Sequence, residues 1–145
     1  MYKHILIPTD GSPLAMTAVT HGVALAKETG ATITALTVIE PFHILTADPV
    51  MLTDTVATYT AHAKAHADQV LATVAKAAAA FKVPCETLSV EHDSVYTAII
   101  ETAHAKRCDL IVMASHGRRG VKAVVLGSET VKVLTHSTIP VLVYR

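Results

Sequence analysis

The sequence predicts a doubly wound α/β fold, in which helices cover both faces of a five-stranded parallel sheet. Short apolar runs alternate with helical stretches along the whole chain, which is the pattern of successive β-α-β units. Two runs, at residues 5–7 and 110–114, are apolar without alternation, as expected for parallel strands buried on both faces. The length of 145 residues is that of one domain, so a single domain over residues 1–145 is expected.

The first strand and the first helix carry clear local signals. The strand is predicted over His4 to Thr9, and the turn Asp10-Gly11-Ser12 closes it. Ser12 is a good N-cap, and Pro13 follows at the first helical position, where a missing N–H group is harmless. Gly30 is expected to end the helix. Its apolar face consists of Ala15, Ala18, Val19, Gly22, Val23 and Ala26.

A second strand is predicted over Ala31–Val38, followed by a loop from Glu40 to Pro49 at a place suited to a lid. From Thr53 to Phe81 the chain is rich in alanine and has no interior proline or glycine, which predicts a long helix. Its apolar stripe is Val56, Tyr59, Ala63, Ala67, Val70, Val74, Ala77 and Phe81. His62 and His66 lie four apart on this helix, but two imidazoles without a third ligand favour a solvated face over a metal site.

The remaining strands differ in how completely they are covered. Polar and apolar residues alternate over Cys85–Glu91, which favours an edge position. A helix over Ser94–Lys106 leads to the central strand at 110–114. The last strand is predicted over Ile139–Tyr144, and Pro140 within it also favours an edge. With the first and fourth strands central, the predicted strand order is 3-2-1-4-5, a Rossmann-like arrangement whose ligands bind where the order reverses.

The turn after the fourth strand has the features of a phosphate-binding turn. Residues 115–120 contain Gly117 and Gly120, which permit close approach of a ligand to the backbone. Ser128 is a suitable N-cap for a helix over Glu129–Thr135, and a helix N-terminus attracts anions. The basic residues nearby are Arg118, Arg119 and Lys122. The alternative is an ordinary strand-to-helix crossover in which the glycines only serve the turn.

Asp10 is expected to face this turn from the end of the first strand, since both strands end at the same edge of the sheet. A carboxylate at that place is suited to pairing with ribose hydroxyls. The alternative is a turn residue that bonds its own backbone.

Composition excludes several classes of function. Twelve Lys and Arg balance twelve Asp and Glu, so the chain lacks the basic field that nucleic-acid binding requires. Its apolar runs are far shorter than the ~20 residues that span a bilayer, and the N-terminus has no signal-peptide pattern. Cys85 and Cys108 form no C-x-x-C motif, which favours reduced thiols. We therefore expect a cytoplasmic protein that binds neither nucleic acid nor membrane.

Four stretches resemble the universal stress protein family, the UspA superfamily, and the resemblance covers the whole chain. They are HILIPTDGS, TVIE, DLIVMASHGRRG and LGSETVKVLTHSTIPVLV. The ATP-binding branch of this family is marked by Gly, two residues, Gly, nine residues, Gly and then Ser or Thr. Here Ala114 replaces the first glycine, and Gly117, Gly127 and Ser128 follow at the motif spacing.

The resemblance implies a site for ATP or AMP, with or without Mg²⁺. Asp10 would hold the ribose, and Val38 would meet adenine through its backbone. The phosphates would be held by Gly117, Gly127 and Ser128, with the N–H groups of the last two donating to them. The full set of predicted nucleotide-binding residues is Pro8, Thr9, Asp10, Val38, Met113, Ala114, His116, Gly117, Arg118, Gly127, Ser128 and Glu129. The family also forms homodimers through its last strand, which implies a dimer through Ile139–Tyr144.

The predicted function is that of an adenine-nucleotide-binding protein that acts as a regulatory or stress-response module. One alternative is a slow ATPase or phosphotransferase that uses the same pocket with His116 as proton acceptor, although the chain has no G-x-x-x-x-G-K-[ST] motif. Another alternative is a nucleotide-free dimeric scaffold. No catalytic residue and no metal ligand are predicted.

Overall fold

The computed structural model describes residues 1–42, 49–117 and 125–145, and side chains in the second range from residue 55 onward. Most of the predicted loop after the second strand and the predicted site residue Arg118 lie outside these ranges. The described elements are β1 (His4–Pro8), α1 (Pro13–Thr29), β2 (Thr32–Ile39), α2 (Pro49–Ala80), β3 (Cys85–Glu91), α3 (Val95–Ala105), β4 (Leu110–Ala114), α4 (Ser128–His136) and β5 (Val141–Tyr144).

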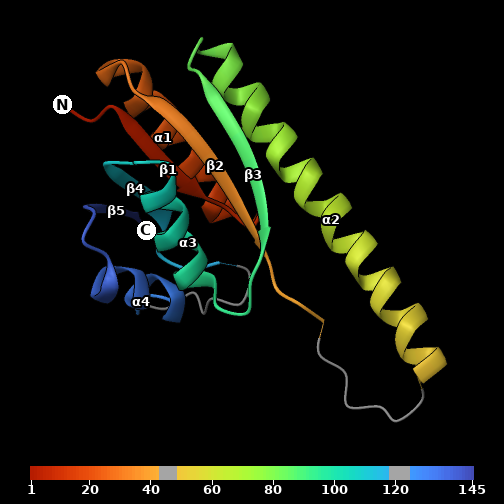
Figure 1. Cartoon of the computed structure of the whole chain (residues 1–145). Coiled ribbons are helices and arrows are strands. Elements are labelled where there is room, and N and C mark those ends of the chain that lie inside the picture. The colour runs from red at the N-terminus through yellow and green to blue at the C-terminus, as the bar shows by residue number, and fades with distance from the viewer. Residues whose placement is uncertain (43–48, 118–124) are drawn as a thin grey trace.

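The strands form one parallel sheet in the order β3-β2-β1-β4-β5, which confirms the predicted fold class and strand order (Figure 1). β1 lies between β2 and β4: Ile5 is paired with Ile33 on one side and with Leu110 on the other. The chain builds outward from β1 to β3 and then returns to the opposite side of β1. The sheet order therefore reverses between β1 and β4, where a doubly wound fold places its ligands.

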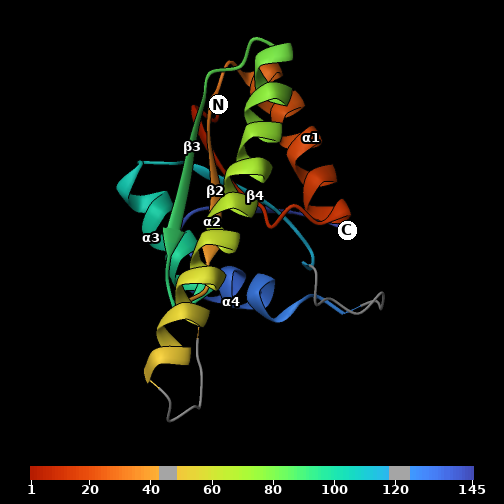
Figure 2. The ribbon, with the colours of Figure 1, turned by 90° about the vertical axis from the view of Figure 1, so that its right-hand side faces the viewer.

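Helices α1 and α2 cover one face of the sheet, and α3 and α4 cover the other (Figure 2). Consecutive residues of β1 point to opposite faces, so Ile5 and Ile7 pack under α1 and α2, while Leu6 packs under α3 and α4. All three side chains are fully buried, as their unbroken apolar run predicts.

The predicted ends of α1 are confirmed. The Ser12 side chain accepts a hydrogen bond from the N–H of Ala15, and Gly30 adopts the left-handed conformation with φ 72°. All six residues of the predicted apolar face are buried.

Helix α2 differs from the prediction in its start and in its buried stripe. It begins at Pro49, and its first half extends beyond the sheet (Figure 1). The predicted stripe member Val56 lies in this half and is therefore 36% exposed, and Phe81, which follows the other end of the helix, is 43% exposed. The residues that meet the sheet are Ala67, Val70, Leu71, Val74 and Ala78. Periodicity identifies an apolar side of a helix, whereas the length of the neighbouring strands decides how much of that side is buried.

Several predicted boundaries are wrong by one or two residues. Strand β2 is shifted by one residue, to Thr32–Ile39, and α3 is one residue shorter at each end, Val95–Ala105. Strand β5 begins at Val141, since Pro140 contributes only its carbonyl oxygen, which accepts from the N–H of Ile111 at 2.9 Å. The N-cap of α4 is Gly127, and the predicted cap Ser128 is the first helical residue. Within the described ranges, none of the helices combines the length and apolarity needed to cross a membrane.

Candidate functional site

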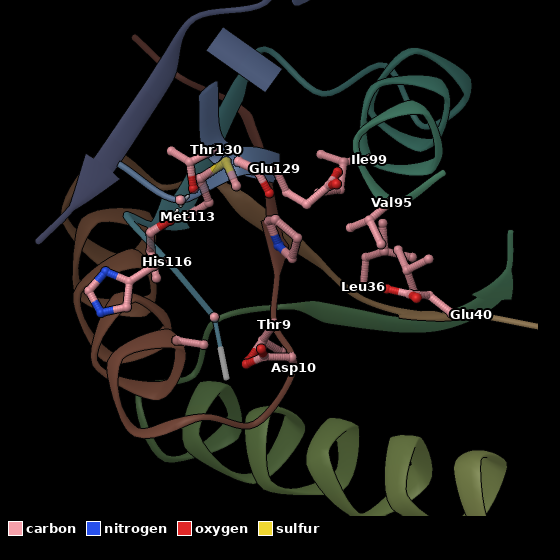
Figure 3. A pocket seen from close by; sticks show the side chains of 17 residues that line it. Thr9, Asp10, Leu36, Glu40, Val95, Ile99, Met113, His116, Glu129 and Thr130 are labelled. Carbon is pink, nitrogen blue, oxygen red and sulfur yellow. Dashed lines mark hydrogen bonds between the residues drawn. The ribbon is translucent and has the colours of Figure 1, made fainter. Parts of the chain in front are cut away.

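A cavity of about 420 Å³ lies beyond the carboxyl ends of β1, β2 and β4, where the strand order reverses (Figure 3). Its volume is within the usual range for a small-molecule site. The structure brings eleven of the twelve predicted site residues to this cavity, and Arg118 is outside the described residues. The eleven are Pro8, Thr9, Asp10, Val38, Met113, Ala114, His116, Gly117, Gly127, Ser128 and Glu129.

The turn between β1 and α1 positions Asp10 at the cavity. Thr9 extends the sheet by donating its N–H to the carbonyl of Leu36 at 2.8 Å. One carboxylate oxygen of Asp10 accepts the N–H of Ser12 at 2.9 Å, as in a turn-forming aspartate. The other oxygen lies against Gly117, and a Cβ atom at position 117 would collide with it. Asp10 therefore forms its own turn, as one interpretation of the sequence expects, and its other oxygen meets the turn after β4, while the ribose contact stays a prediction.

Two hydrogen bonds hold the start of α4 against the end of β4. Thr130 donates its hydroxyl to the carbonyl of Ala114 at 3.0 Å, and Gly127 donates its N–H to the carbonyl of Ser115 at 2.7 Å. The expectation that the Gly127 N–H meets a phosphate is therefore wrong, because Ser115 already accepts it. The φ of Gly127 is −62°, so glycine is not needed there for its backbone conformation. Its advantage is space, since a Cβ atom would lie 3.1 Å from Cα of His116, so the backbone there would have to shift slightly.

The backbone N–H groups that α4 offers to the cavity begin one residue after Gly127, at Ser128. The first backbone hydrogen bond within the helix runs from Val131 to the carbonyl of Gly127. The N–H groups of Ser128, Glu129 and Thr130 precede it and have no acceptor within the helix. All three residues line the cavity. This end of the cavity therefore combines peptide donors with the positive end of the helix dipole, which favours an anion.

The ring of His116 contacts the neighbouring residue Ser115. Its Nδ1 lies 3.1 Å from the hydroxyl oxygen of Ser115, and its ring is turned away from the side of the cavity that Val95 and Ile99 form (Figure 3). The geometry favours a backbone contribution of His116 to the site.

Glu129 is both a cavity residue and a structural one. Its Oε2 accepts the N–H of Tyr96 in the first turn of α3 at 2.9 Å, and its Oε1 lies 3.3 Å from Nζ of Lys132. Ser94, the N-cap of α3, directs its hydroxyl to Thr97 instead of to the helix backbone. Glu129 from α4 therefore supplies the side-chain cap that α3 lacks.

The other end of the cavity is apolar, and sequence reasoning missed most of it. The unpredicted lining residues are Ala15, Leu36, Glu40, Val95, Ile99 and Thr130. Leu36 could have been found, because it lies two positions before Val38 on the same strand face. Val95 and Ile99 are four apart in the first turns of α3, a spacing that puts both on one helix side. A slot between apolar side chains of β2 and α3 is suited to a flat aromatic ring.

Within the described ranges, no group of three or more His, Cys, Asp and Glu side chains is placed to hold a metal ion. His62 and His66 are both exposed on α2. The two cysteines are free and lie outside the cavity lining. Burial raises the pKa of Cys108 to about 11, so this thiol is protonated at neutral pH.

The fold and the cavity define a doubly wound α/β protein with a ligand site at the switch point of its sheet. The family description "Universal stress protein family" matches residues 1–145, and the chain belongs to that family, which confirms the resemblance noted in the sequence.

Several known proteins are similar to this chain. Universal stress protein MJ0531 of Methanocaldococcus jannaschii is 33% identical over 149 residues, which cover 100% of this chain and 83% of that protein. UspA from Lactobacillus plantarum superposes with a TM-score of 0.76 at 31% identity, over 99% of this chain and 98% of that one. Hypothetical protein MJ0577 superposes with a TM-score of 0.83 at 26% identity, over 99% and 96% of the two chains.

Two further solved structures share the fold and contain a nucleotide. One is a universal stress protein in complex with cAMP, at 23% identity and a TM-score of 0.72. The other is the universal stress protein from Archaeoglobus fulgidus in complex with dAMP, at 16% identity and a TM-score of 0.69. At these identities the likeness to this chain extends to the fold.

Proposed function

We propose that this universal stress protein binds an adenine nucleotide, ATP or AMP, in the cavity at the switch point and acts as a regulatory module. One observation carries the proposal: a single cavity joins an apolar slot, a carboxylate and the open N-terminus of α4. These are the three kinds of group that a base, a ribose and a phosphate require. The cAMP and dAMP complexes of proteins with the same fold support this class of ligand.

The proposed pose follows from the polarity of the lining. The base lies in the slot between Val38 of β2 and Val95 of α3, the ribose hydroxyls meet Asp10, and the phosphates meet the N–H groups of Ser128 and its two successors. Each part of the nucleotide then replaces water by a partner of matching polarity, as small-molecule sites usually do.

Ala114, the departure from the glycine motif, is compatible with this pose. Ala114 is 8% exposed and packs with Ala15 and Ala18 of α1. Most of the added side chain is therefore buried against α1, and the backbone at position 114 keeps its place beside the cavity.

The proposal is tested on the purified full chain in two ways. The protein is denatured, and the supernatant is analysed by chromatography for adenine nucleotides that were carried through purification. Calorimetry then measures binding of ATP, AMP and adenosine to nucleotide-free protein, with and without Mg²⁺. We expect ATP or AMP to bind with a Kd in the micromolar range and GTP to bind more weakly. If no adenine compound is released and none binds at millimolar concentration, the proposal is wrong.

We further propose that the site binds nucleotide without enzyme-like turnover. The ring of His116, the proton acceptor that an ATPase reading of this turn would use, lies 3.1 Å from the Ser115 hydroxyl and is turned from the apolar slot. Phosphate release from MgATP should be far slower than the ~1 per second that is low for an enzyme. Faster release that His116→Ala abolishes would favour the ATPase alternative.

We also propose a homodimer through strand β5, which is an end strand of the sheet. The carbonyl groups of Pro140 and Tyr144 accept N–H groups from β4 and its extension, so the alternate residues Val141 and Val143 direct their backbone groups outward. Leu142 is 41% exposed. An open edge of this kind is suited to a second copy.

Light scattering at tens of micromolar tests the dimer. Val143→Pro removes an outward N–H without removing a bond to β4, and it should give a monomer, because proline cannot donate. Val143→Thr keeps the N–H and the branched shape and should remain dimeric. A monomeric wild type, or a dimer unaffected by the proline, would contradict this part of the proposal.

The proposed location is the cytoplasm. Both cysteines are free, and burial is the main factor that raises the pKa of each thiol above its ordinary value. Unpaired, protonated thiols are typical of proteins from reducing compartments.

A further inference from the structure

Glu129 introduces a negative charge at the place where the cavity is otherwise suited to an anion. It is the second residue of α4, so its own N–H is among the donors that face the cavity, and its side chain lines the same cavity. The side chain is 38% exposed, which leaves its charge partly accessible to a ligand.

The carboxylate of Glu129 is held in one position from two sides. The backbone N–H of Tyr96 donates to Oε2 at 2.9 Å, and Nζ of Lys132 lies 3.3 Å from Oε1. Lys132 also lies over the Tyr96 ring, 5.6 Å from its centroid. The Glu129 side chain cannot swing out of the cavity without breaking its hydrogen bond to the backbone of α3. Its charge therefore acts on any ligand that occupies the cavity.

We infer that Glu129 is a specificity-determining residue, whose carboxylate disfavours nucleotides with more phosphate charge and so favours a nucleoside monophosphate over the triphosphate. The inference rests on the proposed function, because it concerns the same cavity. At neutral pH, ATP without metal carries about two more negative charges than AMP. Two added charges roughly 8 Å from a carboxylate in a water-filled, open cavity change relative affinity by about three- to tenfold.

Substitution of Lys132 should change the preference for AMP over ATP in the direction opposite to substitution of Glu129. It neutralises part of the Glu129 charge but does not line the cavity, so its removal should strengthen the effect of the carboxylate. A purely structural role of the Glu129–Lys132 pair predicts that both substitutions act in the same direction. A charge-selecting role predicts that they act in opposite directions.

The experiment measures the ratio of Kd for ATP to Kd for AMP by calorimetry, in EDTA and at low salt. Glu129→Gln should lower this ratio about three- to tenfold, while Lys132→Gln should raise it by a smaller factor. Glu28→Gln is the matched control, since Glu28 is an exposed carboxylate near the end of α1 and outside the cavity lining. Adenosine, which has no phosphate, should bind wild type and Glu129→Gln within about twofold of each other.

Two changes of condition sharpen the test. High salt screens charges, so the difference between wild type and Glu129→Gln should shrink at 0.5 M salt, an ionic strength with a Debye length of about 4 Å. Mg²⁺ neutralises part of the negative charge of ATP and should also shrink the difference between wild type and Glu129→Gln. Circular dichroism on each variant verifies that α3, which Glu129 caps, remains folded.

Each outcome bears on the inference. If wild type binds no adenine nucleotide, the proposed function fails, and the inference fails with it. If ATP and AMP bind but Glu129→Gln leaves their ratio unchanged, the proposed function stands and the inference is overturned. A loss of MgATP affinity in Glu129→Gln would also overturn it, because the carboxylate would then act as a ligand of the metal.

Discussion

Asp109 and Asp10 are carboxylates at opposite ends of the central strand pair β1 and β4. Asp109 precedes β4 at the amino edge of the sheet, and its two oxygens accept the N–H groups of Lys3 and His4 at 2.9 and 3.0 Å. Asp10 follows β1 at the carboxyl edge, where it lines the cavity. Burial alone would raise the pKa of Asp109, but the N–H groups of His4 and Lys3 outweigh it and hold this pKa below its ordinary value.

The comparison shows that the two edges of one sheet have different roles, with the amino edge stabilising the fold and the carboxyl edge suited to binding a ligand. At the amino edge, backbone donors satisfy the carboxylate, so the interaction stabilises the fold. At the carboxyl edge, the first N–H groups of α4 have no helical acceptor, so their partner must come from elsewhere. Substitutions at the amino edge should therefore change stability alone, and substitutions at the carboxyl edge should change ligand affinity first.

The largest effect is expected at Gly127, where a substitution should lower both the nucleotide affinity and the free energy of unfolding. In Gly127→Val, the new Cβ would lie 3.1 Å from Cα of His116 and from the carbonyl oxygen of Ser115, so α4 must move away from β4. This movement should remove two of the contacts proposed between the phosphates and the N–H groups of Ser128, Glu129 and Thr130, worth about 1.5 to 3 kcal/mol each, so affinity should fall roughly 100-fold or more. Overpacking should also cost about 1 to 3 kcal/mol of unfolding free energy.

Calorimetry and thermal unfolding on the same Gly127→Val sample measure both effects. Gly127→Ala, which adds only the Cβ atom, should lose less affinity and less unfolding free energy than Gly127→Val. Unchanged affinity in the valine variant would place the phosphates away from α4.

Asp109→Ala should lower the free energy of unfolding by about 2 to 3 kcal/mol, because it leaves the N–H groups of Lys3 and His4 without their charged acceptor. Nucleotide affinity should not change, since the site is at the other edge of the sheet. Urea denaturation and calorimetry measure the two quantities. A loss of affinity comparable to the loss of stability would break the distinction between the edges.

The contribution of Asp109 should depend on pH with a definite sign. Its folded pKa is lowered, so the stabilisation is fully present above the unfolded pKa of about 3.9 and is lost as the pH falls through the folded value. The stability difference between wild type and Asp109→Ala should therefore be constant between pH 5 and 7 and shrink below about pH 4. A difference that grows in acid would contradict this assignment.

Asp10→Asn should weaken nucleotide binding about tenfold, because a neutral amide is a poorer acceptor for ribose hydroxyls than a carboxylate. The fold should be affected little, since the amide oxygen can still accept the N–H of Ser12. Asp68→Asn on the exposed face of α2 is the matched control and should leave affinity unchanged. Equal affinities of wild type and Asp10→Asn would exclude a ribose contact.

The smallest effect is expected at Tyr59, which ties the projecting half of α2 to the rim of the cavity. Its hydroxyl donates to the carbonyl of Glu40 at 3.0 Å, and its ring stacks on Phe42 at 4.6 Å. Tyr59→Phe keeps the stack and removes one exposed hydrogen bond, so affinity should change by less than about threefold. A change above tenfold in calorimetry would mean that α2 controls the site at the carboxyl edge.

Most of the residues that gather at the cavity were predicted from the resemblance to a known family. The sequence by itself determined the fold class, the strand order and the ends of α1. These features depend on local signals: unbroken apolar runs mark β1 and β4, and Ser12, Pro13 and Gly30 mark the ends of α1. Capping and periodicity act over a few residues, so they can be read without knowledge of the neighbours in space.

Only the tertiary structure decided which polar groups are already occupied and how far each apolar face is covered. The Gly127 N–H is used by Ser115, and Glu129 caps a helix that begins 34 positions earlier, at Val95. Val56 lies on the apolar side of α2 but is exposed, because the sheet ends before it. A hydrogen bond or an apolar contact depends on what lies opposite in space. That partner is brought there by the packing of distant segments, which no local pattern encodes.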